Sequence, residues 1–342
     1  MKRDSRINER QRKVLFCAVR EYILTKKPVS SERILETSDI QCSGATVRND
    51  LRRLEYLGYL RQPHTSAGRI PTDKGFKFYV EETLKLMKEY YQPSASIHST
   101  YPMSFGDMEK ILEGAARALS KITQGAVVLE KPKIDKLKII RVFVVPVTRH
   151  YYIMTVTTEL GFMKFIPFRT FEKIDVANFE KLLNKLLVGY ALEQMPQRRF
   201  EENINEEMIE IAENLVKSLS EDLRNSLIKV GLDTLINSED FNIQEIRKLS
   251  QFFSEDLALK KVMDQTQDLP QILIGSEHGL QGLENFALFI DEYKKEDRSI
   301  GKIMVITSKV VKYEEIFSSL RYITSRLTEY FTLAIRKEGI EQ

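Results

Sequence analysis

The stretch SGATVRNDLRRLEYLGYL (residues 43–60), with the loop PHTSAGRIPTDKG (residues 63–75) that follows it, decides the fold of the N-terminal quarter of this chain. Its apolar residues recur at i, i+4 and i+7: Val47, Leu51 and Leu54. That spacing predicts a helix with one buried stripe, capped by Ser43 and ended near Gly58. The loop is so rich in Gly, Pro, Ser, Thr and Asp that it predicts a shaped turn rather than a helix or a central strand.

Two shorter patterns precede this helix. Apolar residues recur at helical spacing over residues 8–25, and SSERILE (residues 30–36) predicts a short second helix with Ser30 or Ser31 as its N-cap. A polar turn, TSDIQCS (residues 37–43), separates the second helix from the third. A short helix, a turn and a longer helix in this order are typical of a helix-turn-helix.

The outer face of the third helix has the chemistry of a DNA-contacting surface. At 100° per residue, the side opposite the apolar stripe is small, amide-bearing and basic. It holds Ala45, Asn49 and Arg52, flanked by Thr46, Arg48 and Arg53, with Ser43 at the helix start. A small residue lets the helix approach a duplex, Asn bonds adenine, Arg bonds guanine, and flanking cations hold phosphates. Any solvated helix carries such residues, so the interpretation depends on helix order, charge and loop together.

The loop is predicted to form a wing beside this helix. The flanking segments YLRQ (residues 59–62) and FKFYV (residues 76–80) alternate like strands, so the loop would join them as a hairpin. In that hairpin Arg69 and Lys74 can face a phosphate or the minor groove. The candidate DNA contacts of the wing are His64, Thr65, Ser66, Arg69 and Lys74.

Charge is distributed unevenly along the 342 residues. Residues 1–80 hold 17 Lys and Arg against 9 Asp and Glu, a net charge of about +8, whereas the remainder holds 35 against 40, about −5. A basic first quarter indicates that the N-terminal part handles a polyanion. Two such basic units repel each other, so residues from about 100 onward are expected to dimerise alone and residues 1–90 to be monomeric, with weak half-site binding.

Several classes of protein are disfavoured. The charged start, MKRDSRINERQRKVLF (residues 1–16), and the lack of an apolar window long enough for a membrane span predict a cytoplasmic protein. The two cysteines, Cys17 and Cys42, fit no metal or disulfide pattern and the four histidines are scattered, so no metal or other cofactor is expected. Phosphate-binding, dinucleotide and nucleophile motifs are also missing from the sequence, and an enzyme is not expected.

The remaining three quarters alternate between strand and helix patterns. Residues 91–104 are rich in Pro and Ser and predict a linker, and residues 138–169 predict a three-stranded antiparallel meander because they are dense in β-branched and aromatic residues. Helical patterns cover residues 107–123, 176–193, 206–229, 243–263 and 313–331, and strands return at 271–276, 286–293 and 301–308. This order predicts an α+β domain interrupted by a largely helical insertion.

Residues 43–80, from SGATVRND through PHTSAGRIPT to FKFYV, strongly resemble the signature region of the bacterial heat-inducible transcription repressors, the HrcA family. The resemblance implies a winged helix-turn-helix, then a GAF-like domain with an inserted dimerising domain. It also implies a repressor that binds an inverted-repeat operator, CIRCE, ahead of chaperone genes, with support from the GroE chaperonin. Two motifs depart from the family pattern: TSKVVKY (residues 307–313) stands in place of Gly-Pro-Thr-Arg-Met-Asp-Tyr, and IGSEH (residues 274–278) ends in His.

The expected protein is a multidomain α+β repressor of heat-shock genes that binds double-stranded DNA as a homodimer. Its expected parts are a winged helix-turn-helix (1–90), a linker (91–104), a GAF-like α+β domain (105–165 and 265–342) and an inserted dimerisation domain (166–264). Two alternatives stay open. One is a metabolite sensor with a small ligand in the GAF-like domain. The other is an RNA-binding factor, which would lack the paired sheet aromatics of RNA modules.

Overall fold

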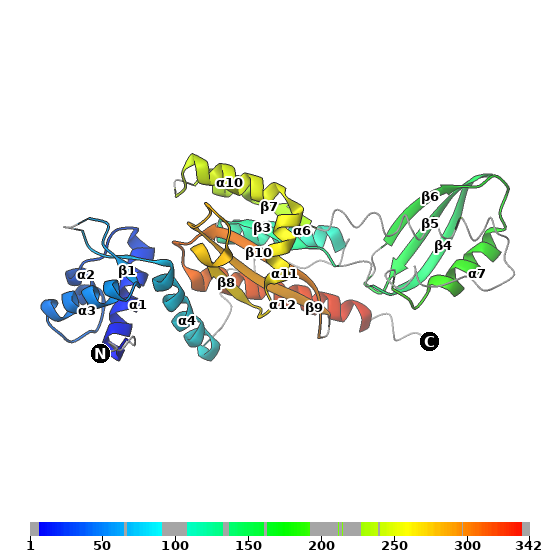
Figure 1. The fold of residues 1–342 in the computed structure, drawn as a ribbon. Coiled ribbons are helices and arrows are strands. Elements are labelled where there is room, and N and C mark those ends of the chain that lie inside the picture. Colours follow the sequence, from blue (N-terminus) through cyan, green and yellow to red (C-terminus); the bar gives the residue numbers. More distant parts are fainter. Residues whose placement is uncertain are drawn as a thin grey trace, which may run out of the picture.

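The computed structural model consists of three parts in a row. It describes residues 7–64, 67–90, 108–132, 137–160, 163–191, 211, 214, 227–238, 240–295 and 297–336. The N-terminal unit (residues 7–90) and a lobe made of a small sheet and one helix lie at opposite ends of a central domain, the core (Figure 1). The expected linker, residues 91–104, lies outside the described residues.

The N-terminal unit contains the three predicted helices. Its elements are α1 (Glu9–Thr25), α2 (Ser31–Thr37), α3 (Gly44–Tyr56), β1 (Leu60–Arg61), β2 (Ile70–Pro71) and α4 (Asp73–Tyr90). Asn8 begins α1 with a capping box to Gln11, and Ser30 and Ser43 cap α2 and α3. Gly58, just past α3, has a φ of 77°, a left-handed conformation that glycine adopts without strain.

The predicted second arm of the hairpin is wrong. β1 pairs with β2, so the hairpin closes inside the loop, and FKFYV belongs to α4 instead of a strand. Thr72 Oγ1 accepts a hydrogen bond from the backbone N–H of Gly75 at 3.3 Å and so starts the helix. The buried residues of α4 include Phe76, Tyr79, Val80 and Thr83, which have helical i, i+3, i+4, i+7 spacing. Phe78 is buried as well, so apolar residues stand at every second position from Phe76 to Val80, and this alternation suggested a strand.

The core is built on a five-stranded sheet with every neighbouring pair antiparallel. Its strands are β3 (Ala126–Glu130), β7 (Leu227–Val230), β8 (Gln271–Ile274), β9 (Phe286–Lys295) and β10 (Arg298–Ser308), in the order β7-β3-β10-β9-β8. The strands predicted at 286–293 and 301–308 are confirmed. The strand predicted at 271–276 ends at Ile274, where a 3-10 turn begins. The helix predicted over residues 206–229 is wrong at its end, where residues 227–230 form β7; most of the rest lies outside the described residues.

Helices cover both faces of the core sheet. One face carries α6 (Met108–Thr123) and α12 (Tyr313–Arg336), and the other carries α9 (Leu232–Ile236), α10 (Ile243–Ser254) and α11 (Asp256–Gln265). The successive residues Val127 and Val128 of β3 are both fully buried, one against each helical layer. The sheet is therefore the centre of three layers. The helix predicted over residues 243–263 is two helices, which meet at Glu255.

The lobe contains the predicted meander as a sheet of its own. It consists of β4 (Ile139–Thr148), β5 (Tyr151–Thr158), β6 (Met163–Arg169) and the helix α7 (Val176–Leu187). Phe179 and Leu183 of α7 are fully buried against one face of this sheet. The topology differs from the expected division, because the meander lies outside the core sheet and the chain rejoins that sheet at residue 227.

Candidate nucleic-acid interface

The burial of α3 follows its sequence pattern. Val47 and Leu54 have no exposed surface and Leu51 is 5% exposed, so the predicted inward stripe is confirmed. Ala45, Asn49 and Arg52 are exposed on the opposite side. The side chains of Asn49 and Arg52 make no hydrogen bond or ion pair with another described residue, so both are available to an external partner. Ser43 Oγ accepts from the backbone N–H of Thr46 at 3.2 Å and fixes the start of this helix.

A buried carboxylate holds α3 against α1, and sequence reasoning missed it. The side chain of Asp50 is 5% exposed and accepts from Arg10 Nε at 2.7 Å and from Gln11 Nε2 at 3.3 Å. Asp50 lies three residues after Val47, on the inward stripe of the helix, and this position could have predicted that its carboxylate is buried. A buried charge needs its partner, so this contact helps to hold α3 against α1.

The residues that flank the exposed face are tied to neighbouring groups but remain accessible. Arg48 is 62% exposed and donates to Ser31 Oγ at 3.3 Å and to Glu32 at 3.4 Å. The guanidinium of Arg53 lies over the Tyr56 ring, 5.4 Å from its centroid. The Thr46 and Ser43 hydroxyl groups are 2.9 Å apart. The structure thus gathers the α3 candidates at one end of the N-terminal unit.

Two residues that were predicted to lie in the wing have partners inside the protein, and one of them, Lys74, belongs to the first turn of α4 rather than to the hairpin. Arg69 is 14% exposed and its Nε donates to Glu55 at 3.0 Å. Lys74 donates to the carbonyl oxygen of Leu57 at 2.9 Å, at the C-terminus of α3 where a cation is favourable, and its Nζ also lies over the Tyr59 ring. His64 is exposed, and Thr65 and Ser66 lie outside the described residues.

Arg61 is an exposed cation of the β1–β2 hairpin that the sequence reasoning did not select. It lies on β1 next to buried Leu60, and its side chain makes no hydrogen bond or ion pair with another described residue. It is also among the residues that line a cleft between the N-terminal unit and the core. The two-residue period of the strand was the signal, because the neighbour of a buried strand residue points outward.

Other kinds of site have little support in the described residues. No helix in that part of the chain is long and apolar enough to span a membrane. Nor do three or more His, Cys, Asp or Glu side chains gather there in a way that could hold a metal ion. Cys17 and Cys42 are both free thiols, and burial raises the pKa of the Cys17 thiol.

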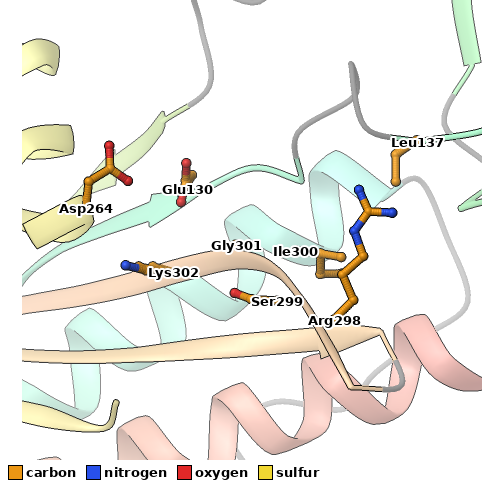
Figure 2. Close-up of a pocket in the computed structure, with 8 residues that line it drawn as sticks. All are labelled: Glu130, Leu137, Asp264, Arg298, Ser299, Ile300, Gly301 and Lys302. Atoms are coloured by element: carbon orange, nitrogen blue, oxygen red, sulfur yellow. The ribbon is translucent and has the colours of Figure 1, made fainter. Parts of the chain in front are cut away.

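A pocket of about 240 Å³ at one end of the core sheet bears on the metabolite-sensor alternative (Figure 2). Its charged lining residues are Glu130, Asp264, Arg298 and Lys302. The ammonium group of Lys302 donates to the carbonyl oxygens of Met263 at 2.6 Å and Thr266 at 3.0 Å, so it is engaged within the protein. Ligand pockets usually measure about 300–1,000 Å³. Size and lining therefore select no ligand class here.

The chain is similar to proteins of one family over nearly its whole length. The family profile described as "HrcA protein C terminal domain" matches residues 109–317. Proteins named heat-inducible transcription repressor HrcA from Thermotoga petrophila and Thermotoga maritima are 40% identical over 332 residues, which cover 97% of this chain and 96% of theirs. The protein of that name from Caldanaerobacter subterraneus is 30% identical over 334 residues, 94% of this chain and 96% of its own.

A solved structure has the same fold. It is a 2.2 Å crystal structure described as that of a hypothetical protein, 37% identical in sequence, and it superposes with a TM-score of 0.73. The match covers 96% of this chain and 100% of that one.

Proposed function

The chain belongs to the HrcA family of heat-inducible transcription repressors, and from that membership we propose that it represses heat-shock genes by binding an inverted-repeat DNA operator as a homodimer. The observation that carries the proposal is the exposed face of α3. Asn49 and Arg52 are the side-chain types that make paired hydrogen bonds to adenine and guanine, and Ala45 lets the helix approach the bases. In this proposal α2 and α3 are the helix-turn-helix, α3 enters the major groove, and the β1–β2 hairpin is the wing.

The wing is proposed to contact phosphates. Arg61 and His64 are exposed, and we place the first wing contacts there. Arg69 and Lys74 remain candidates, but each exchanges an internal partner, Glu55 or the Leu57 carbonyl, for a phosphate. Such contacts add affinity for every sequence, while the α3 contacts add discrimination.

The outer face of the lobe sheet is the proposed dimer interface. It carries large apolar side chains with 43–62% of their surface exposed: Phe143, Val145, Met163 and Phe165. In the sheet register Phe143 and Phe165 both pair with Thr155, one from each side, so the exposed rings lie in one row across the sheet. A contiguous exposed apolar patch of this kind marks an interaction site. A second copy would bury it and give two α3 helices related by a two-fold axis.

Finer aspects of the proposal come from the family resemblance. We propose from it that the core is GAF-like and that the lobe is the inserted dimerisation domain. We also propose that the operator is CIRCE and that the GroE chaperonin modulates repression. We assign the protein no enzymatic activity.

Binding to chaperone-gene promoters at a stated salt concentration tests the function. Asn49→Ala or Arg52→Ala should lose about 1–3 kcal/mol at one operator position and flatten base preference there. Arg61→Met should weaken specific and random duplexes alike and reduce the salt slope by about one unit. An unchanged ratio of specific to random binding in the α3 variants contradicts the assignment of α3.

A further inference from the structure

The N-terminal unit and the core share one hydrophobic cluster, which includes the buried residues of α4. The rings of Phe76 and Tyr79 each lie 6.3 Å from the ring of Tyr313, at the start of α12, and Tyr313 lies 5.6 Å from Phe289 of β9. Tyr313 is 1% exposed, and its hydroxyl donates to the carbonyl oxygen of Lys309 at 2.6 Å. α4 is thus packed against the core as well as against its own unit.

One carboxylate at the start of α4 gathers three donors from two separate segments of the core. Asp73 accepts from the backbone N–H of Ser276 at 3.0 Å, from Ser276 Oγ at 3.1 Å and from Lys309 Nζ at 2.8 Å. We call Asp73, Ser276 and Lys309 the clasp. Charge-assisted hydrogen bonds of this kind are directional as well as attractive. The clasp therefore fixes the angle of α4 as well as its contact with the core.

The core side of the clasp is shaped to receive this carboxylate. Gly275, in the 3-10 turn Gly275–His278 (η4), has a φ of 56°, and a Cβ atom there would overlap the carboxylate of Asp73. Only glycine combines that backbone conformation with so close an approach.

Two further ion pairs cross the same junction. Lys77, one turn after Asp73, lies 3.0 Å from Glu277, and Lys26 at the end of α1 pairs with Asp240. The N-terminal unit is thus attached to the core both at the start of α4 and at the end of α1, which resists rotation as well as sliding. A cleft of about 450 Å³, lined from both units, lies beside Asp73 and admits solvent to the junction. The clasp is therefore accessible and can be broken without disrupting a sealed core.

We propose that the clasp is the positioning element that sets the half-site spacing of the operator. This inference rests on the proposed function, in which two copies join through their lobes and each carries one DNA-contacting α3. The N-terminal unit and the lobe lie at opposite ends of the core (Figure 1), so the separation of the two α3 helices depends on the angle between unit and core. Half-site spacing is a geometric property of a dimer, and a fixed angle selects one spacing while a variable angle accepts several.

The test measures binding of the full chain to a set of duplexes that carry the same two half-sites with different spacers. The wild-type protein should prefer one spacing by about tenfold or more over spacers that differ by a few base pairs. Asp73→Ala and Lys309→Met should reduce that preference to about twofold, because an unclasped unit can adjust its angle. Binding of a duplex with a single half-site should stay within about twofold of wild type, because α3 itself is unchanged.

Gly275→Ala tests the clasp from the core side. Its added Cβ displaces the Asp73 carboxylate, so it should flatten the spacing preference in the same way. The matched control is Glu82→Gln, which breaks the ion pair between Glu82 and Arg12 (2.6 Å). That pair joins α4 to α1 inside the N-terminal unit, so the control should keep the wild-type spacing profile.

Two negative results have different meanings. If the wild-type protein discriminates between spacings and the three clasp variants discriminate equally well, the clasp proposal is overturned and the proposed function stands. If the wild-type protein binds inverted repeats no better than a single half-site, dimeric operator binding fails and the clasp proposal fails with it. Flattening in the Glu82→Gln control as well also overturns the clasp, because the effect would then come from general loosening of α4.

Discussion

The N-terminal unit shares its hydrophobic core with the central domain, whereas the lobe has a hydrophobic core of its own. The cluster that contains Val14 and Leu54 of the N-terminal unit continues into Phe289 and Ile323 of the core. The lobe cluster contains only lobe residues, with Phe179 and Leu183 at its centre. At its base the lobe meets the core through Leu137 and Leu160 and through the ion pair of Glu159 with Lys295.

This difference indicates which parts of the molecule unfold together. A unit that shares a hydrophobic core exposes apolar surface when it separates from its neighbour, whereas a unit with a separate core and a small junction exposes little. The N-terminal unit is therefore expected to unfold together with the core, and the lobe to unfold independently.

The largest expected effect follows removal of the aromatic side chain at the centre of the shared cluster. Tyr313→Ala should lose about 3–5 kcal/mol of unfolding free energy, as large aromatic truncations in a packed core do. Because Tyr313 contacts both α4 and β9, the N-terminal unit and the core should also separate into two unfolding transitions. Thermal unfolding followed by calorimetry measures both. A single transition at the wild-type midpoint would mean that Tyr313 does not couple the units.

A truncation in the lobe should stay local. Leu183→Ala leaves a cavity under the lobe sheet and should lose about 3 kcal/mol, because Leu183 has no exposed surface. Amide hydrogen exchange should then accelerate in β4, β5 and α7 and remain at wild-type rates in α1 and β10. Equal acceleration in α1 would show that the lobe and the N-terminal unit unfold together, against the comparison drawn above.

A charge on the outer face of the lobe should separate the proposed dimer. Phe165→Asp should weaken self-association by about 2 kcal/mol or more, because it places a carboxylate in an apolar interface. The folded monomer should be little affected, since Phe165 is 62% exposed. Sedimentation measures the association. The control is Leu257→Asp on α11, which is 84% exposed on the core and should leave association unchanged.

The smallest expected effect is a pH dependence of the clasp. Burial raises the pKa of Asp73, but hydrogen bonds from Lys309 and Ser276 outweigh it and hold the pKa below its ordinary value of 3.8. A lowered carboxyl pKa means that the contribution of Asp73 to docking is complete above pH 3.8 and is lost as pH falls through the lower, folded-state pKa. Asp73→Asn should remove this part of the acid sensitivity of the junction. Calorimetry between about pH 5 and about pH 2 measures it, as the pH at which the N-terminal unit and the core cease to unfold in one transition.

The lobe junction supplies the control for that experiment. The pKa of Glu159 is also lowered, because hydrogen bonds from Lys295 and the backbone of Lys138 outweigh the raising effect of burial. Acid sensitivity of the lobe junction should therefore persist in Asp73→Asn. Loss of acid sensitivity at both junctions would mean that the substitution acts on the whole fold.

Local sequence patterns predicted most elements but could not assign long-range partners. The stripe of Val47, Leu51 and Leu54 and the dense β-branched residues of the meander depend on neighbours in the chain, so their helix and strands were predictable. The apolar residues of FKFYV fit the two-residue period of a strand and also the period of a helix. In the structure this segment is helical, and the hydrogen bond to Thr72 Oγ1 caps the start of that helix. A period also does not say which sheet a strand joins, so the separate lobe sheet was not predicted.

The candidate site shows the same limit. The exposed face of α3 follows from its helical period, and the structure confirms its exposure. The partners of Arg69 and Lys74 are Glu55 and the Leu57 carbonyl, which come close only when the chain between α3 and α4 is folded. Sequence spacing alone cannot show that a basic side chain already has a partner in the folded protein. Base contacts by Asn49 and Arg52 stay a prediction.

The attachment of the lobe to the core sheet has a consequence for how such a chain could be assembled or redesigned. The chain leaves the core sheet after Glu130 and rejoins it at Leu227, and these two residues are opposite each other in the β3–β7 ladder. Two residues in a tight turn are enough to connect paired antiparallel strands. The whole segment between Glu130 and Leu227 is thus an insertion between the two strands of one hairpin, and it could be replaced. Deleting it, or grafting another oligomerising module in its place, would leave the strand order and register of the core sheet intact.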